Sequence, residues 1–188
     1  MNKNLPQRGY SLLELIVSLA VFSMVMLVVM GAYLTLISLD RQARASNQLA
    51  ATLNFSVESM ARTLRTGTEY DCGAGGAPQN CTSGADSITF MDSQNRQVSY
   101  RLMGTNSSSP GSIGQCSGPA TCTDANAVPL TDRRIQITTL DFYVRGVGRT
   151  DYVQPSVTFV IAGTMTTDAG ETTSFAIQTG ASQRFLEL

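Results

Sequence analysis

The most conspicuous pattern in the chain is an unbroken apolar run from Leu15 to Leu39. This run contains no charged residue over 25 positions. A helix of about that length rises roughly 37 Å, which is enough to cross the ~30 Å hydrocarbon core of a bilayer. Together with the residues that lead into it, the run predicts a membrane-spanning helix over residues 10–39.

The helical pattern continues past the apolar run, but on one face only. Apolar or small residues recur at spacings that alternate between four and three, as in an amphipathic helix. The stripe consists of Leu39, Ala43, Ser46, Ala50, Leu53, Val57, Met60 and Leu64. We therefore expect one helix over residues 10–66, ended by Gly67, and a covering sheet or domain for its second half, residues 40–66. The alternative is a stalk that only connects a membrane to a domain.

The remainder, residues 67–188, is polar and alternates at the period of β-strands. Strands are expected at Ser87–Met91, Gln97–Leu102, Arg134–Val144, Ser156–Thr164 and Thr172–Phe185, with a turn at Thr166–Glu171 and long loops at Asp71–Asp86 and Gly104–Asn126. Short connections favour antiparallel pairing. The pattern predicts an α+β fold, in which one long N-terminal helix, transmembrane in its first half, packs on an antiparallel β-sheet.

Charge and composition exclude several functions. The chain has no histidine, so Ser–His–Asp and Cys–His catalysis are impossible. No spacing gathers its aspartates and serines into a site, and we expect neither an enzyme nor a cofactor. A net charge of −1 gives no electrostatic basis for binding nucleic acid, although a local patch of Arg133, Arg134, Arg145 and Arg149 stays possible.

Four cysteines lie in the two expected loops, namely Cys72, Cys81, Cys116 and Cys122. Four cysteines allow three pairings, and the connectivity is left open, although local pairing within each loop is the simplest. Disulfides would place these loops on the oxidising side of a membrane. Eight and five intervening residues do not give the close spacing of a zinc site, so no metal is expected.

Glu14 is a carboxylate at the start of an otherwise apolar helix. Lys3 and Arg8 precede it, which favours a cytoplasmic N-terminus. The charge either requires a partner or lies at headgroup level near a helix N-terminus, where it is tolerated. The residues alone leave both interpretations open. The role of Gly31 is likewise left open: either the helix melts locally there, or another helix approaches it closely.

The segment Arg8–Leu15, RGYSLLEL, resembles the processing motif of type IV prepilins and type II secretion pseudopilins. Tyr10 stands where phenylalanine is usual. The resemblance implies a leader, residues 1–9, that a prepilin peptidase removes between Gly9 and Tyr10 before it methylates the amine of Tyr10. It also implies that Glu14 pairs with the Tyr10 amine of a neighbouring subunit during filament assembly.

The same resemblance implies a location and partners. The precursor would cross the inner membrane once, with its N-terminus cytoplasmic and its globular domain outside, and would then enter an extracellular or periplasmic filament. Its partners would be the lipid bilayer before assembly, the peptidase, an inner-membrane assembly platform, and other pilins through the N-terminal helix.

The C-terminal half resembles minor pilins and J-type minor pseudopilins more loosely. The segments that carry this resemblance are Pro129–Thr131, Leu140–Val144 and Phe175–Arg184. The expected function is therefore a structural subunit, a minor pilin or pseudopilin, of a type IV pilus or type II secretion-like filament. The alternative is a filament-tip binding module for adhesion or DNA uptake.

Overall fold

The computed structural model describes residues 10–72, 76–104, 111–118, 121–147, 153–167 and 170–184. It contains one long helix, α1 (Leu12–Thr66), followed by nine strands. The chain forms two compact units, Met1–Arg44 and Ala45–Leu188, and the boundary between them falls inside α1. Each unit is described by itself.

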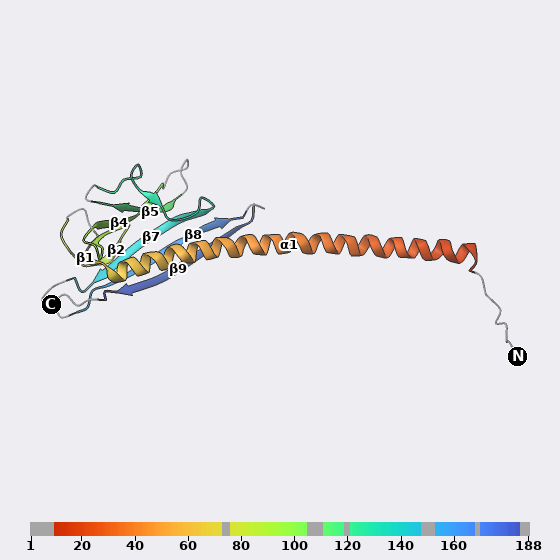
Figure 1. Ribbon diagram of the computed structural model, residues 1–188, viewed down its shortest axis with the longest axis horizontal. Helices are drawn as coiled ribbons and strands as arrows, with labels where there is room; N and C mark the ends of the chain where they lie inside the picture. The colour runs from red at the N-terminus through yellow and green to blue at the C-terminus, as the bar shows by residue number, and fades with distance from the viewer. Residues whose placement is uncertain are drawn as a thin grey trace. The chain divides into compact units, whose positions relative to one another are not determined.

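The first unit is helical from Leu12 onward (Figure 1). The prediction placed the helix start at Tyr10, two residues too early. The reason is local, because the Ser11 side chain accepts a hydrogen bond from the backbone N–H of Glu14 and so caps the helix. The helix runs unbroken through Gly31, where an added Cβ would meet no atom within 4 Å.

In the second unit, residues 45–66 of α1 bury one face. The buried residues are Leu49, Leu53, Ser56, Val57, Met60, Ala61 and Leu64. The predicted stripe is confirmed at four of its positions, from Leu53 onward. Its start is wrong, because Leu39 and Ala43 are exposed and the first buried residue is Leu49. The helix ends before Gly67, as predicted.

The strands form two antiparallel sheets instead of one. The five-stranded sheet has the order β1-β3-β4-β5-β6, with β1 (Thr68–Asp71), β3 (Ser87–Met91), β4 (Gln97–Met103), β5 (Ser112–Ser117) and β6 (Val128–Pro129). The four-stranded sheet has the order β2-β7-β8-β9, with β2 (Cys81–Ala85), β7 (Ile135–Arg145), β8 (Ser156–Thr166) and β9 (Thr172–Ser182). The predicted strands agree with β3, β4, β7, β8 and β9 to within a few residues, apart from Phe185, which lies outside the described residues.

Two predicted loops contain strands. Strand β5 lies within the loop expected at Gly104–Asn126, and β2 lies within the loop expected at Asp71–Asp86. Both are rich in glycine and serine, which disfavour strands locally, and both exist because a longer strand pairs with them. Strand β5 pairs with β4 from Val98↔Ser117 to Met103↔Ser112 without a bulge. Pairing with a distant strand thus overrides local preference.

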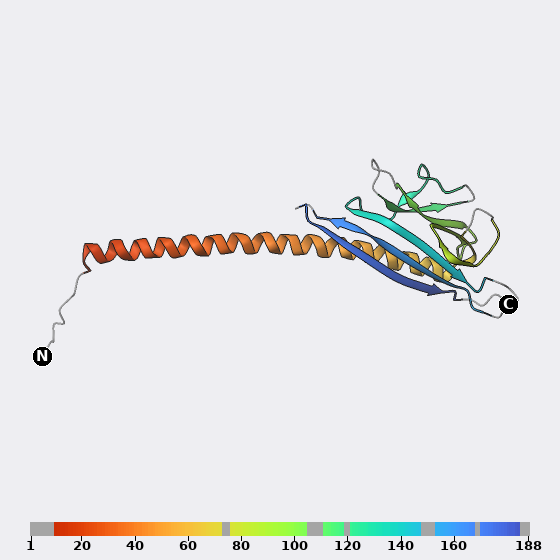
Figure 2. The same ribbon diagram turned by 180° about the vertical axis from the view of Figure 1, so that it is seen from behind.

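One hydrophobic core joins the two sheets and α1. It includes Leu53, Met60 and Leu64 from the helix, and it gathers inward-facing aromatic residues from both sheets. The aromatic side chains are Tyr70, Phe90, Tyr100, Phe142 and Phe159, none of them more than 1% exposed. Figures 1 and 2 show residues 45–66 of α1 running along the sheet of β7, β8 and β9. Every core residue comes from position 49 or later, so the second unit contains its own core.

The C-terminal end of α1 is held by strands that flank it. The hydroxyl of Tyr70 in β1 lies 2.5 Å from the Leu64 carbonyl and 2.8 Å from the Gly67 carbonyl. The backbone N–H of Arg184, which follows β9, donates to the Arg65 carbonyl at 2.9 Å. The last carbonyls of a helix have no partner within it, and here β1 and the end of β9 supply the donors.

Both cysteine-containing loops close on themselves. Cys72 pairs with Cys81, and Cys116 pairs with Cys122. In the first loop, the buried carboxylate of Asp71 accepts hydrogen bonds from the Gly76 N–H at 2.8 Å and the Gln79 side chain at 2.9 Å. The described cysteines leave no free thiol. The fold is therefore α+β, with one long helix on antiparallel sheets and two disulfides.

Candidate functional site

The first turn of α1 is built by Ser11 and Glu14. Ser11 precedes the helix, and its hydroxyl accepts from the N–H of Glu14 at 3.2 Å. Glu14 is the acidic residue of the first turn, where the positive end of the helix dipole stabilises a carboxylate. The order Ser-x-x-Glu before an apolar run is a capping-box sequence. Ser11 was missed at the sequence level although this signal was present.

The residues that flank this turn are open to solvent. Tyr10 is 85% exposed, and Glu14 is exposed one turn later. Among the residues that the structure describes, Glu14 forms no ion pair within the single chain. The predicted leader, residues 1–9, lies outside the described part, and so does Gly9 at the predicted cleavage point. Tyr10 and Glu14 are thus both accessible to another molecule.

No described residue of the chain covers the apolar half of α1. Its exposed large side chains between Leu12 and Leu39 are 49% to 78% accessible. A window of this helix is long and apolar enough to cross a membrane. A helix that is apolar on all sides needs lipid or other helices around it.

Hydroxyl side chains inside this apolar stretch are satisfied by the helix itself. Ser18 donates to the Glu14 carbonyl at 2.7 Å, Ser23 to the Leu19 carbonyl at 2.8 Å, and Thr35 to the Gly31 carbonyl at 3.0 Å. In lipid a polar group without a partner is costly. Because these bonds lie within one helix, the helix can be surrounded by lipid or by other helices without losing them.

Comparison with known protein families identifies this segment. Residues 4–30 match the model of the prokaryotic N-terminal methylation motif. This match supports a type IV pilin-like protein. The motif implies processing by a prepilin peptidase and assembly with other pilins, and an apolar N-terminal helix that carries it fits membrane anchoring.

The motif covers only the N-terminal part of the chain. No curated protein and no solved structure matched the chain. The architecture of the remainder, with a helix packed on antiparallel sheets and two disulfides, is pilin-like.

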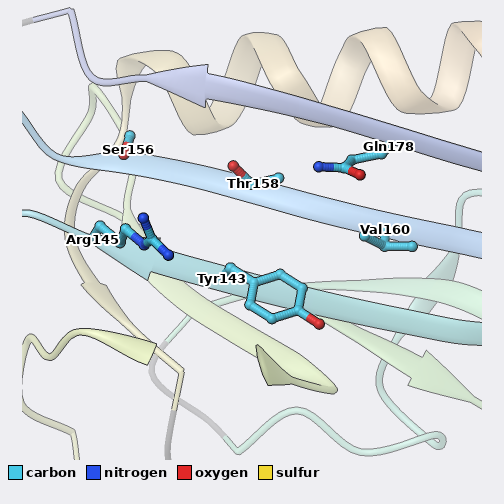
Figure 3. Close-up of a pocket in the computed structure, with 6 residues that line it drawn as sticks. All are labelled: Tyr143, Arg145, Ser156, Thr158, Val160 and Gln178. Atoms are coloured by element: carbon cyan, nitrogen blue, oxygen red, sulfur yellow. The ribbon is translucent and has the colours of Figure 1, made fainter. Parts of the chain in front are cut away.

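A second candidate site is a shallow groove on the outer face of the four-stranded sheet (Figure 3). It has a volume of about 460 Å³ and is lined by Tyr143, Arg145, Ser156, Thr158, Val160 and Gln178. Gly84 in β2 leaves space for the Tyr143 ring, because a Cβ at this position would lie only 3.2 Å from that ring. Sequence analysis did not find this groove, since alternating hydroxyl residues are ordinary on the solvent face of a strand.

The predicted arginine patch is not assembled within the described residues, because Arg134 directly precedes β7 and Arg145 is the last residue of that strand. Arg134 pairs with Asp132 at 3.1 Å, which neutralises its charge locally. Arg145 lines the groove and has no acidic partner among the residues described. Arg149 lies outside the described part of the chain. Across the described ranges, no three metal-binding side chains lie close enough to hold an ion.

Proposed function

We propose that the chain is a structural subunit, a minor pilin or pseudopilin, of a type IV pilus or type II secretion-like filament. The observation that carries this proposal is the methylation motif on a helix whose apolar side chains are exposed on every side. Such a helix is stored in lipid and released only into a bundle of similar helices. The chain would then act by packing and not by catalysis.

Processing would prepare the N-terminus for assembly. A prepilin peptidase would remove residues 1–9 by cutting between Gly9 and Tyr10, and would methylate the new amine of Tyr10. Lys3 and Arg8 leave with the leader, so 11 arginines remain against 14 acidic residues. Cysteines paired as disulfides support a globular domain outside the inner membrane.

Glu14 would contact the methylated Tyr10 amine of a neighbouring subunit. A carboxylate among packed apolar helices needs an opposite charge, and the basic residues of the leader are no longer present. The main rival is a contact within one subunit. The helix begins at Leu12, so Tyr10 precedes it and could approach Glu14 without opening the first turn.

Assembly of Glu14 variants tests this proposal. We expect Glu14→Ala and Glu14→Leu to insert in the membrane and to be cut after Gly9, but to be depleted in sheared filaments relative to the membrane pool. Glu58→Ala is the matched control, because it removes a carboxylate of the same helix whose contact with Arg62 is exposed and long, at 3.9 Å. Normal recovery of both Glu14 variants in filaments would contradict the assembly role.

Cross-linking separates the two possible partners of Glu14. Lys3 is the only lysine, so the amine of Tyr10 is the only one left after cleavage. A carbodiimide joins a carboxylate to an amine with loss of water. Peptide mapping of treated filaments should find the Tyr10 peptide of one subunit bonded to the Glu14 peptide of another, in a product of dimer size. A product of monomer size would assign the contact to a single subunit.

The alternative, a filament-tip binding module, has the groove around Arg145 as its only specific support. The processed chain carries more acidic than basic residues, whereas DNA affinity comes mainly from neutralising phosphates. Salt-dependent DNA binding by the full chain in detergent, lost in Arg145→Ala, would favour this alternative.

A further inference from the structure

The edge of β9 differs from the other edges of the two sheets. An open edge strand presents unpaired N–H and C=O groups, and proteins usually protect it with shortness, bulges, proline or charge. Strand β1 has four residues and a register shift, β2 has five and a register shift, and β6 has two residues, one of which is Pro129. Strand β9 has 11 residues and contains no proline and no charged residue.

The pairing of β9 with β8 shows which of its backbone groups are free. Its register runs without a bulge from Ser156↔Ser182 to Thr166↔Thr172. At its two ends, Gln183 donates to the Pro155 carbonyl and the Glu171 carbonyl accepts from Thr167. Odd-numbered residues therefore face β8, since bonding alternates along an antiparallel strand. The groups that point to the free edge belong to Thr172, Ser174, Ala176, Gln178, Gly180 and Ser182.

This edge is open. The even-numbered residues of β9 are all exposed, whereas those of β8, on the same outer face, are all partly covered. Gly180 has no side chain, so its exposure is that of its backbone. On the inner side, Phe175 and Ile177 pack against the core but are only partly buried. The edge thus combines unpaired backbone with apolar side chains that an added strand would cover.

We propose that the edge of β9 receives an extended segment of a different protein that assembles with this chain, added as an antiparallel strand. Such a segment would supply the missing backbone partners. Apolar side chains on one of its faces would lie beside Phe175 and Ile177, and small polar side chains would lie beside Ala176 and Gln178. It would carry no charge toward the edge, because β9 has none to match it.

The direction of β9 disfavours a second copy of the chain as the partner. Figures 1 and 2 show β9 and residues 45–66 of α1 running in the same direction. An antiparallel pair of two β9 strands would therefore point residues 45–66 of the two copies in opposite directions, whereas subunits that enter a filament from one membrane share one direction. In a parallel pair, the apolar face of one β9 would continue into the polar face of the other. The two strands would then share no continuous apolar face. This choice of partner rests on the proposed function.

Hydrogen exchange of the full chain tests this inference. In detergent, the amides of Ser174, Ala176, Gln178 and Gly180 should exchange quickly, while the amides that face β8 are protected. In sheared filaments, the same edge amides should slow by roughly tenfold or more. Unchanged edge exchange in filaments that contain the chain would overturn the inference and leave the proposed function standing.

Matched variants exclude a general effect of charge or of the groove. Gln178→Lys places a charge on the edge strand, and Thr158→Lys places the same charge one strand inward; both side chains line the groove. Gln178→Lys should remove the edge protection and reduce recovery in filaments by roughly fivefold or more, which corresponds to the loss of about one hydrogen bond. Thr158→Lys should have neither effect. Equal effects of the two variants would overturn the inference.

Two further outcomes also decide the case. Edge protection in detergent that grows with protein concentration would show pairing between copies and would overturn the assignment to a different protein. Absence of the processed chain from filaments would remove the proposed function, and the inference that rests on it would fail with it.

Discussion

Tyr70→Phe tests how the helix is fastened to the sheets. The change removes one hydroxyl from a side chain that is 1% exposed and keeps its ring, which packs beside Phe90. In the variant, the Leu64 carbonyl keeps the N–H of Gly67 at 3.2 Å, but the Gly67 carbonyl loses the tyrosine donor at 2.8 Å. A buried polar group that loses its partner costs about 1–3 kcal/mol.

That cost translates into a thermal shift. For a unit of this size, we expect the unfolding midpoint of the full chain in detergent to fall by roughly 3–10 °C. Near-ultraviolet circular dichroism of the buried tyrosines would follow the transition. Tyr143→Phe is the matched control, because Tyr143 lies on the outer face and its hydroxyl has no protein partner among the described residues. Equal midpoints for the two variants would refute the role of Tyr70 at the helix end.

Two other predictions concern the loops. Replacing Cys72 and Cys81 together by serine should lower the free energy of unfolding by about 2–3 kcal/mol, as expected for a short closed loop, and urea unfolding against the intact chain would measure it. The side-chain hydrogen bond from Arg134 holds the pKa of Asp132 below its usual 3.8. Stability from this carboxylate is therefore present above about pH 3.8 and lost as the pH falls through the lowered pKa. The advantage of the wild type over Asp132→Asn in unfolding midpoint should shrink in acid, and an advantage that grows there would contradict the assignment.

The helix was largely predictable because its signals are local. Spacings of three and four residues identified Leu53, Met60 and Leu64 as a buried face, and all three lie in the core. The same spacing included Leu39 and Ala43, which the single chain leaves exposed. A stripe shows that a helix needs a cover, but the spacing is the same whether the cover is its own sheet or another molecule.

The strands show the limit of local patterns. Strands β3, β7, β8 and β9 alternate clearly and were predicted. Strand β5 did not stand out, because Gly114 interrupts its alternation. A Cβ at Gly114 would lie 2.4 Å from the Met103 sulfur, so that side chain would have to move. The division into two sheets also could not be predicted, because it depends on which distant strands pair.

The candidate sites were predictable to different degrees. Tyr10 and Glu14 are recognised by the order of residues around them, so a short motif was sufficient. Ser11 carried a readable capping signal. The groove depends on three strands placed side by side, and the open edge of β9 depends on its being last in its sheet. Both are properties of sheet order and leave no mark in the sequence.

The mass of the processed chain tests the central claim most directly. Full-length protein would be produced with a prepilin peptidase, purified from membranes, and measured intact and after digestion. The proposed function predicts loss of residues 1–9 and a new N-terminal Tyr10 that carries one methyl group. A control with Gly9→Leu should stay uncut, because a bulky residue replaces the one that lacks a side chain. An intact, unmethylated wild-type chain under these conditions would contradict the proposal that this protein is a processed filament subunit.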